Sequence, residues 1–209
     1  MAVVLEASAL VCARGGRTLF NNVAFTLAGG TLLHVAGANG SGKTSLLRIV
    51  CGLSTPDSGE LRWRGESMRK VREEYWRHLI YVGHANALKD DLTALENLKF
   101  AAALAGFNVE PDIAAAALDQ FGVAQCGHLP ARVLSQGQRK RVALSRLALA
   151  PRGGLWVLDE PFSALDVDAV EHLRALIAAQ LAGGGAVIFT THQEVAIAAA
   201  VRITVRLGG

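Results

Sequence analysis

Eight consecutive residues near the N-terminus have the composition of a phosphate-binding loop. They are Gly37, Ala38, Asn39, Gly40, Ser41, Gly42, Lys43 and Thr44. Small residues allow backbone N–H groups to converge on phosphate oxygens, and a helix that starts after the loop adds about half a positive charge. Lys43 is expected to reach the β- and γ-phosphates of a nucleotide, and the Thr44 hydroxyl to bind Mg²⁺. An ordinary glycine turn before a helix is the alternative, but the Lys-Thr pair in register favours the phosphate site.

Two adjacent carboxylates form a second candidate element. Asp159 and Glu160 directly follow the apolar run Leu155–Leu158, so a strand there would present both at its carboxyl end. Asp159 is the expected Mg²⁺ ligand through water, and Glu160 is placed to polarise an attacking water. An Asp-Glu pair at the end of a strand is common on protein surfaces, so this assignment depends on the phosphate loop upstream.

These residues need strands and helices that hold them in place, and the apolar pattern supplies them. Residues 32–36 predict a buried strand that runs into the loop, and residues 45–51 predict the helix after it, which stops at Gly52. Residues 155–158 and 187–191 predict two further strands, separated by an amphipathic helix. That helix is expected over residues 168–182, which makes strand, helix and strand a parallel crossover unit.

The rest of the chain divides into an N-terminal β segment and a central helical segment. Short strand-like runs at residues 3–5 and 23–27 predict an antiparallel hairpin. Residues 91–150 are rich in alanine and leucine at helical spacing, and the motifs that begin at Thr93 and Ser135 fit capping boxes at helix starts. We therefore expect a mostly helical lobe between the strands of the core.

Composition excludes several classes of protein. With 209 residues, 51% hydrophobic and 19% charged, the chain is expected to be globular, with one domain or two small lobes. Its longest apolar stretches fall short of the roughly 18 residues of a membrane-spanning helix, and the N-terminus lacks the pattern of a secretory signal. The net charge of +3 does not indicate nucleic-acid binding. The three cysteines are scattered without metal-ligand spacing and are expected to be reduced packing groups.

The segment Leu134-Ser135-Gln136-Gly137-Gln138, followed by Arg139-Lys140-Arg141, closely resembles the signature motif of ABC ATPases, usually written LSGGQ. In that family the motif binds the γ-phosphate held by the phosphate loop of the opposite subunit. The resemblance implies a homodimer with two shared ATP sites, to which Ser135, Gln136, Gly137 and Gln138 each contribute. Gln136 replaces the usual glycine. A capped helix with no further role is the alternative.

Two later segments match the family in order. Ser163-Ala164-Leu165-Asp166 resembles the D-loop, which implies that Asp166 communicates between the two ATP sites. Thr190-Thr191-His192 resembles the segment of the switch histidine. The resemblance implies that His192 contacts the γ-phosphate and orients the attacking water together with Glu160.

Two positions depart from the family pattern. The segment 81–84 aligns with the glutamine loop, but His84 stands where the glutamine normally touches Mg²⁺ or the attacking water. His84 is therefore a candidate catalytic residue and Mg²⁺ ligand, with a loop histidine packed at the lobe boundary as the alternative. Arg14 stands where the family commonly has an aromatic residue against adenine. A guanidinium plane can also stack on a base, and an exposed arginine in a turn is the alternative.

The resemblance implies an α/β fold, a P-loop NTPase of the ABC ATPase type. It has a RecA-like parallel-sheet core, an antiparallel β subdomain and a helical lobe that carries the signature motif. We expect a single domain over residues 1–209. Within it, residues 1–87 and 151–209 form the ATP-binding core lobe, and residues 88–150 form the helical lobe.

Finer details resemble the ATP-binding subunits of the bacterial cytochrome c maturation (haem exporter) system. They are Tyr81-Val82-Gly83-His84, the helix start at 92–98, the signature segment through Leu147, and Gln193 after the switch histidine. The resemblance implies a peripheral ATPase on the cytoplasmic face of the inner membrane. Its partners are separate transmembrane subunits and, indirectly, a periplasmic haem chaperone. A cytoplasmic helix of a membrane subunit is expected to dock at residues 84–92.

Other functions share parts of this pattern. An ATPase subunit for another substrate, such as a lipid, a drug or a metal chelate, is the main alternative, because the ATPase motifs carry no information on cargo. A soluble ABC protein acting on DNA or ribosomes usually has a long coiled-coil insertion or a second cassette, and neither is present here. A nucleotide kinase or GTPase has no use for the signature motif followed by a switch histidine. We therefore expect no nucleic-acid partner.

Overall fold

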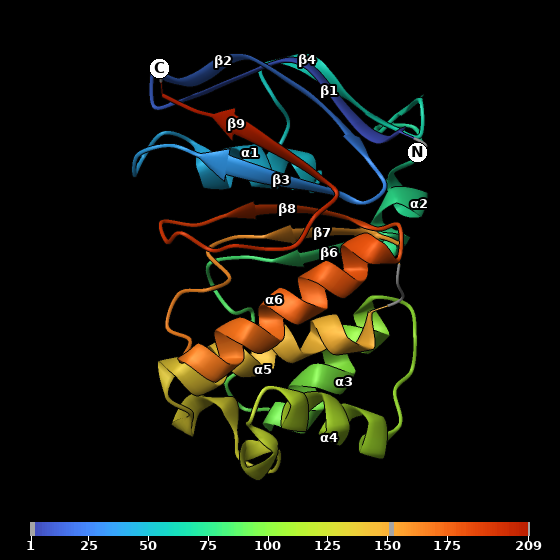
Figure 1. Cartoon of the computed structure of the whole chain (residues 1–209), viewed down its shortest axis with the longest axis vertical. Helices are drawn as coiled ribbons and strands as arrows, with labels where there is room; N and C mark the ends of the chain where they lie inside the picture. The colour runs from blue at the N-terminus through green and yellow to red at the C-terminus, as the bar shows by residue number, and fades with distance from the viewer. Residues whose placement is uncertain (1–2, 151–152, 209) are drawn as a thin grey trace.

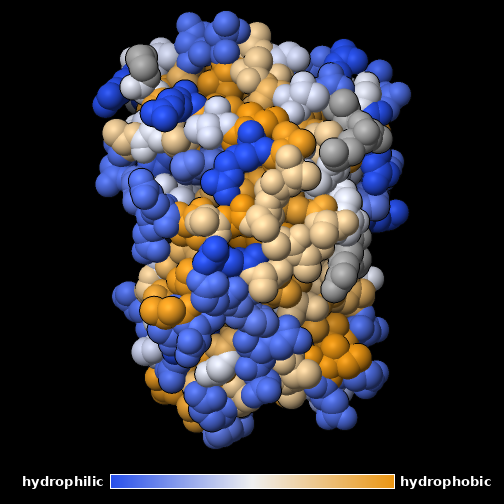
Figure 2. All heavy atoms as spheres, in the orientation of Figure 1, coloured by the Kyte–Doolittle hydropathy of each residue, from blue (hydrophilic) through white to orange (hydrophobic). Residues whose placement is uncertain are grey.

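Two β-sheets lie one above the other with a helix between them, and a group of helices covers the far side (Figure 1). The computed structural model describes residues 3–150 and 153–208. α1 (Lys43–Val50) lies between the antiparallel and the parallel sheet, and α6 (Val167–Ala182) covers the opposite face of the parallel sheet. On the face shown in Figure 2, hydrophilic side chains cover much of the helical lobe and the surroundings of the antiparallel sheet, and hydrophobic ones show mainly between them.

The antiparallel sheet has the strand order β2-β1-β4-β5. Its strands are β1 (Val3–Arg14), β2 (Arg17–Ala28), β4 (Ser58–Trp63) and β5 (Glu66–Ser67). β1 and β2 form a hairpin whose turn residues, Gly15 and Gly16, have φ angles of 57° and 74°. Two successive left-handed residues are typical of a type I′ hairpin turn, and glycine adopts this conformation without steric cost.

The parallel sheet has the strand order β6-β7-β8-β3-β9, and every neighbouring pair in it is parallel. Its strands are β3 (Thr31–Ala36), β6 (Leu79–Val82), β7 (Leu155–Leu158), β8 (Ala186–Thr190) and β9 (Val201–Arg206). The carboxyl ends of parallel strands meet at one edge of the sheet. The predicted phosphate loop, the Asp159-Glu160 pair and His192 follow β3, β7 and β8, so the topology brings them to the same edge.

The parallel sheet divides the hydrophobic core in two. Leu33 and Val157 pack in the cluster between the sheets, which includes α1, whereas Leu32 and Trp156 pack in the cluster on the side of α5 and α6. Neighbouring residues of a strand point to opposite faces, so consecutive apolar residues are needed when both faces are covered. This explains why β7 and most of β8 appear in the sequence as continuous apolar runs, and why β3 is apolar apart from Thr31 and His34.

The helical lobe follows β6 along the chain. It consists of α3 (Ala94–Leu104), α4 (Pro111–Gln120), the short 3₁₀ turns η1 (Ala124–Cys126) and η2 (Ala131–Val133), and α5 (Gln136–Leu149). Thr93 and Glu96 form a reciprocal capping box at the start of α3, and Ser135 and Gln138 do the same for α5. Both predicted capping boxes are confirmed, as are the mixed α/β class, the parallel core, the antiparallel subdomain and the helical lobe.

Some element boundaries differ from the predictions. The hairpin strands are each 12 residues long, whereas only their short apolar runs were predicted. The pairing register of β1 with β2 shifts several times, and Ala9 within β1 has a φ angle of 49°, so the alternation of apolar and polar residues breaks although the strand continues. α1 begins at Lys43, two residues before the predicted start at Ser45.

Five elements were not predicted at all: β4, β5, α2 (Arg72–Arg77), β6 and β9. α2 has only six residues, which is too short for a helical periodicity to be recognised. β9 lies at the edge of the parallel sheet, and its side chains are exposed or partly exposed, so it has no continuous apolar run.

The division into lobes at residues 87 and 151 stays a prediction, and its positions 1–2, 151–152 and 209 lie outside the described residues. Cys12, Cys51 and Cys126 are free and buried, in agreement with packing roles. Burial raises the pKa of the Cys51 thiol far above its usual value. Within residues 3–150 and 153–208, no helix combines the length and apolarity that crossing a membrane requires.

The central position of β3 gives a stability prediction. Leu33 is completely buried between the sheets, whereas Leu104 on α3 is 74% exposed. Leu33→Ala is expected to lower the free energy of unfolding by about 2–5 kcal/mol, because it removes buried methyl groups and leaves a cavity. Leu104→Ala is the matched control and should change it by less than about 0.5 kcal/mol in urea denaturation. Equal effects of the two substitutions would contradict this description of the core.

Candidate functional site

The loop between β3 and α1 is open to an anion at the start of the helix. Gly42, the residue before α1, has a φ angle of 99°, and no side chain caps the first N–H groups of the helix. A side chain at Gly37 would bring its Cβ within 2.7 Å of the Leu207 carbonyl oxygen. The Ser41 hydroxyl is buried and has no hydrogen-bond partner among the described residues. Uncapped helix N–H groups and an unpaired buried hydroxyl fit phosphate oxygens as ligands.

Lys43 is held inside this loop. Its Nζ donates to the carbonyl oxygens of Gly37 and Ala38 at 2.8 and 3.1 Å, so the ammonium group stays over the loop although the side chain is largely buried. Carbonyl oxygens carry no net charge, so an anion that enters the loop can form a charge-assisted hydrogen bond with this ammonium group.

Asp159 connects two strands and a helix at the carboxyl edge of the sheet. Thr44 Oγ1 donates to Asp159 Oδ2 at 2.9 Å, and Thr190 Oγ1 donates to Asp159 Oδ1 at 2.7 Å. Asp159 and Thr190 are buried. The carboxylate therefore ties the start of α1 and the end of β8 to the end of β7.

Glu160 and His192 face each other across the same edge. His192 Nε2 lies 3.3 Å from Glu160 Oε1, with the histidine half exposed and the glutamate mostly covered. The Glu160 backbone has a φ angle of 49°, and its N–H donates to Thr190 Oγ1 at 2.9 Å. The turn after β7 thus holds the carboxylate beside the imidazole. Apart from this contact, Glu160 Oε1 is buried and accepts no hydrogen bond from the described residues.

Lys140 of α5 adds a positive charge behind the two carboxylates. Its side chain is almost completely buried, and burial lowers the pKa of its ammonium group, while the negative charges of Asp159 and Glu160 act in the opposite direction. A cation in this position partly balances the two adjacent carboxylates. In the sequence Lys140 is part of the basic run Arg139-Lys140-Arg141, and only its burial in the structure distinguishes it from a surface lysine.

One groove of about 700 Å³ collects most of the predicted site residues. Those that line it are Arg14, Asn39, Gly40, Gly42, Lys43, Thr44, His84, Asp159, Glu160 and His192. Leu19, Ser45 and Ser163 line it as well and were not predicted as site residues. Arg14 and His84 therefore line the same groove as the phosphate loop, and their roles there stay predictions.

The signature residues lie elsewhere on the chain. Ser135, Gln136, Gly137 and Gln138 form the start of α5 and do not line this groove. A side chain at Gly137 would bring its Cβ within 3.2 Å of the Ala164 carbonyl oxygen, and Arg141 forms an ion pair of 3.4 Å with Asp166. The start of α5 is thus packed against the predicted D-loop. Asp166 also caps α6 by accepting from the N–H of Ala169 at 3.0 Å.

Sequence reasoning assigned no role in the site to Thr190 beyond its place in the switch segment. A threonine at the end of a buried strand looks like any residue of a strand, and its bonds to Asp159 and Glu160 depend on the β7-β8 pairing. Ser163 was part of the D-loop match, but its hydroxyl donates to the Glu160 carbonyl oxygen at 2.8 Å and so fixes the turn at that residue.

The oxygen atoms of the groove fit a divalent cation that takes only one or two ligands from the protein and the others from water and phosphate. Thr44 Oγ1 and Asp159 Oδ2 are oxygens within hydrogen-bond distance of each other, and Mg²⁺ is commonly bound by one or two protein oxygens together with substrate phosphates. Among the described residues, no group of three or more histidine, cysteine, aspartate and glutamate side chains could hold a metal ion alone. The site therefore fits Mg²⁺ brought together with a phosphate ligand.

Comparison with known proteins agrees with this geometry. A family model described as "ABC transporter" matches residues 20–163. A Nitrosomonas europaea protein named "Cytochrome c biogenesis ATP-binding export protein CcmA" is 54% identical over 191 residues, which cover 91% of this chain and 89% of that protein. A Dechloromonas aromatica protein of the same name is 49% identical over 98% of this chain and the whole of that protein.

Solved structures share the fold. A structure described as the ATP-binding subunit of an ABC transporter is 26% identical, with a TM-score of 0.80 over 90% of this chain and 79% of that one. A dimeric ATP-binding cassette in a post-hydrolysis state, bound to ADP and phosphate, has a TM-score of 0.78 at 23% identity over 90% of this chain and 88% of that one. At that identity the second similarity shows the fold alone.

The bonds of Thr190 give a prediction for the site. Thr190→Val keeps the shape of the side chain but leaves the Glu160 N–H and Asp159 Oδ1 without this partner in a buried region. The free energy of unfolding should fall by about 1–3 kcal/mol. Thr204→Val, on the exposed side of β9, is the control and should stay within about 0.5 kcal/mol of the unsubstituted protein. If the two variants unfold at the same urea concentration, the Thr190 hydroxyl does not organise the site.

Proposed function

Because this chain belongs to the ABC transporter family, we propose that it is the ATP-hydrolysing subunit of a transporter complex for cytochrome c biogenesis. The observation that carries the ATPase assignment is the convergence of Lys43, Thr44, Asp159, Glu160 and His192 on one groove. The names of two relatives that are 54% and 49% identical to this chain support the assignment to cytochrome c biogenesis. ATP hydrolysis would be coupled to haem export or to release of a periplasmic haem chaperone.

The phosphate loop binds the triphosphate of ATP. The residues from Gly37 to Thr44 supply backbone N–H groups, and Lys43 exchanges one of its two carbonyl partners for phosphate oxygens. Thr44 and Asp159 hold Mg²⁺, which when bound neutralises charge on the phosphates. For this the Thr44 hydroxyl turns from Asp159, and the short distance between the two oxygens supports their sharing one ion.

Glu160 polarises the attacking water. Its Oε1 contacts His192 but accepts no hydrogen bond from the described residues, and the turn after β7, where the φ angle of Glu160 is 49°, places the carboxylate in the groove of the phosphate loop. His192, whose Nε2 lies 3.3 Å from Glu160 Oε1, is proposed to hold the water and the γ-phosphate in line. His84 lines the same groove and is proposed to contact the water or Mg²⁺ in place of the family glutamine.

Two copies of the chain are needed for complete ATP sites. The signature residues do not line the groove of their own chain, which supports a homodimer in which Ser135, Gln136, Gly137 and Gln138 of one copy close the site of the other. The Ser135 hydroxyl accepts from Gln138 but keeps its own proton to donate to a phosphate oxygen. Asp166, joined to Arg141 of the signature helix, would transmit the state of one site to the other. Arg14 is proposed to cover the adenine.

Separate transmembrane subunits complete the transporter, with this chain as a peripheral protein on the cytoplasmic face of the bacterial inner membrane. The segment 84–92 is proposed to receive a cytoplasmic helix of a membrane subunit, since it leads from the groove into the helical lobe. Haem and its chaperone are partners of the membrane subunits. An ATPase subunit for a lipid, a drug or a metal chelate stays the alternative, because the groove carries no information on cargo.

Replacement of Glu160, which acts on the attacking water, tests the mechanism. Glu160→Gln keeps the size of the side chain but not its ability to take up a proton, so it should bind ATP and hydrolyse it about 10²–10⁴-fold more slowly. With hydrolysis blocked, the variant should accumulate as a dimer with ATP. Phosphate release and light scattering measure the two effects. A variant that remains monomeric with ATP would contradict the shared-site dimer.

Identification of the proteins that bind this chain tests the assignment to cytochrome c biogenesis. The tagged chain, used as bait on solubilised native membranes, is expected to recover small membrane subunits together with haem absorbance from a haem chaperone. Mass spectrometry identifies the recovered proteins, and Glu160→Gln with ATP should retain the same partners. Recovery of an unrelated permease would reassign the cargo and leave the ATPase mechanism in place.

A further inference from the structure

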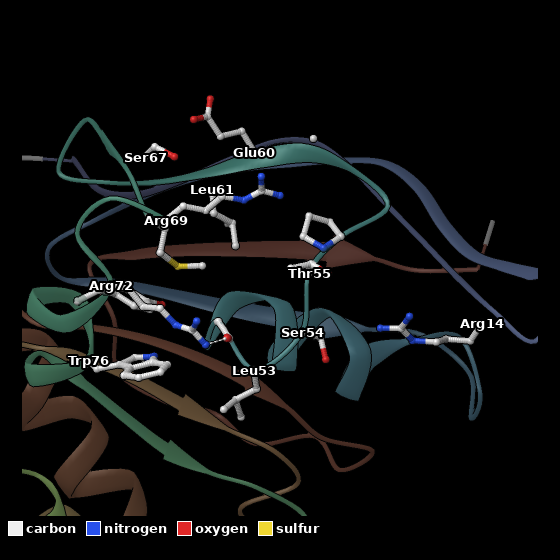
Figure 3. A pocket seen from close by; sticks show the side chains of 15 residues that line it. Arg14, Leu53, Ser54, Thr55, Glu60, Leu61, Ser67, Arg69, Arg72 and Trp76 are labelled. Atoms are coloured by element: carbon white, nitrogen blue, oxygen red, sulfur yellow. Dashed lines mark hydrogen bonds between the residues drawn. The ribbon is translucent and has the colours of Figure 1, made fainter.

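One buried cation of the chain does not line the ATP groove. Figure 3 shows the more common situation of exposed cations: Arg14, Arg69 and Arg72 line a groove of about 690 Å³ beside α2, and all three are open to solvent. Lys140 on α5, by contrast, is only 4% exposed. Among the described residues, the other buried lysine is Lys43, which belongs to the phosphate loop. Because a buried ammonium group loses its hydration, it requires a compensating charge nearby.

The two neighbours of Lys140 in the sequence are bound directly by acids, whereas Lys140 is not. Arg139 Nη1 lies 2.8 Å from Asp90 Oδ1, and Arg141 Nη1 lies 3.4 Å from Asp166 Oδ2. With the residues that the structure describes, the Lys140 ammonium group forms no such ion pair and donates no hydrogen bond. The charge that compensates Lys140 must therefore act over a longer distance.

The face of α5 that carries Lys140 packs on the parallel sheet. Lys140, Leu144 and Leu147 follow each other at helical spacing, so they share one face of the helix. Leu144 and Leu147 belong to the buried cluster that also contains Leu158 and Phe162. These last two residues stand on either side of the two adjacent carboxylates in the chain. The face of α5 that carries Lys140 therefore lies against the segment that carries the carboxylates.

The contact at the start of α5 sets the position of Lys140 along this segment. A Cβ added at Gly137, in the first turn of α5, would lie 3.2 Å from the carbonyl oxygen of Ala164, which follows the carboxylates in the chain. Lys140 is one turn nearer to this end of the helix than Leu144. Its side chain thus lies near the carboxyl end of β7, on the side of the sheet that α5 covers, and does not line the ATP groove.

The two carboxylates provide the compensating charge. Burial lowers the pKa of the Lys140 ammonium group, and the negative charges of Asp159 and Glu160 act in the opposite direction. Asp159 accepts hydrogen bonds from the hydroxyls of Thr44 and Thr190, but hydroxyls carry no net charge. The repulsion between the two adjacent carboxylates is therefore relieved on the α5 side by the Lys140 ammonium group.

We propose that Lys140 is a positioning residue for ATP hydrolysis, which acts as the resident counter-ion of the Asp159-Glu160 pair and holds the turn after β7 against α5. The inference rests on the proposed function for the reaction and for Mg²⁺. Because Lys140 belongs to the chain, its charge stays in place when the metal and the nucleotide leave. It limits the repulsion between the carboxylates when no ligand is bound, and it opposes a further positive charge at Thr44 and Asp159.

A neutral residue of similar length tests the counter-ion. Lys140→Met keeps an unbranched side chain and removes the charge. The dissociation constant of a fluorescent, non-hydrolysable ATP analogue is measured in EDTA and in excess Mg²⁺, and the first constant divided by the second gives the magnesium ratio. Without the opposing charge of Lys140, the magnesium ratio should rise by at least about threefold. Damage to the packing of the site would lower it instead.

Turnover by the same variant tests the positioning role. In Lys140→Met, kcat should fall about tenfold or more, because the carboxylate that acts on the water is less well held. KM for ATP should not rise, since Lys140 does not line the groove that binds the nucleotide. Phosphate release over a series of ATP concentrations measures both constants.

Two further variants separate charge from packing. Lys140→Arg keeps the charge and should hold both kcat and the magnesium ratio within about threefold of the unsubstituted chain. Lys99→Met is the matched control, because it makes the same change at an exposed residue of α3 that does not line the ATP groove. It should leave both quantities within about twofold. If methionine at position 140 prevents folding, Lys140→Gln repeats the test with a neutral polar side chain.

The outcomes distinguish this inference from the proposed function. If the unsubstituted chain neither binds the analogue nor hydrolyses ATP, the proposed function fails, and the inference fails with it. If the unsubstituted chain does both and Lys140→Met matches Lys99→Met, Lys140 is not the counter-ion, while the proposed function stands. An unchanged kcat or a lower magnesium ratio in Lys140→Met would likewise overturn the inference, as would equal losses of kcat in Lys140→Arg and Lys140→Met.

Discussion

The carboxylate of Asp159 is the point on which the arrangement of the site depends. It accepts one hydrogen bond from Thr44 in the first turn of α1 and another from Thr190, the residue that ends β8. A buried carboxylate is stable only when its oxygens are paired, so the three segments must meet at this point for the fold to be favourable. The same requirement sets the turn after β7, because the Thr190 hydroxyl that donates to Asp159 also accepts from the Glu160 N–H. The hydrogen bonds that stabilise the fold at Asp159 are therefore the same ones that position the residues of the ATP site.

α1 transmits this arrangement through the molecule. It is covered by the antiparallel sheet on one side and the parallel sheet on the other, and its buried side chains belong to the cluster between them. Its first turn is left uncapped, whereas α3, α5 and α6 are capped by side chains at their starts. The carbonyl oxygens of Val50, Cys51 and Gly52, at and just after its end, accept hydrogen bonds from side chains of α2. Packing along its length holds α1 in place, and no side chain occupies the N–H groups of its first turn. An anion can therefore bind these N–H groups without reorganisation of the helix.

The charges in the ATP groove match its ligand. The groove at the phosphate loop mixes both signs of charge, with Arg14 and Lys43 beside the carboxylates of Asp159 and Glu160, which suits a phosphate ligand that arrives with a metal ion. The chain does not complete the ATP site alone, because the signature residues do not line their own groove. This is consistent with a subunit of a larger assembly.

The phosphate loop, the carboxylate pair, both capping boxes and the strand-loop-helix unit could be predicted from the amino-acid sequence, because each depends on neighbours within a few residues. Long stretches of uniform periodicity also indicated the lobes. The folded structure was needed to show that Arg14 and His84, far apart in the chain, line the groove of Lys43, and that Thr190 and Lys140 lie beside the carboxylates. The six residues of α2 and the edge strand β9 were missed for the same reason. Their positions come from packing and from hydrogen bonds between distant segments, which leave no periodic signal in the chain.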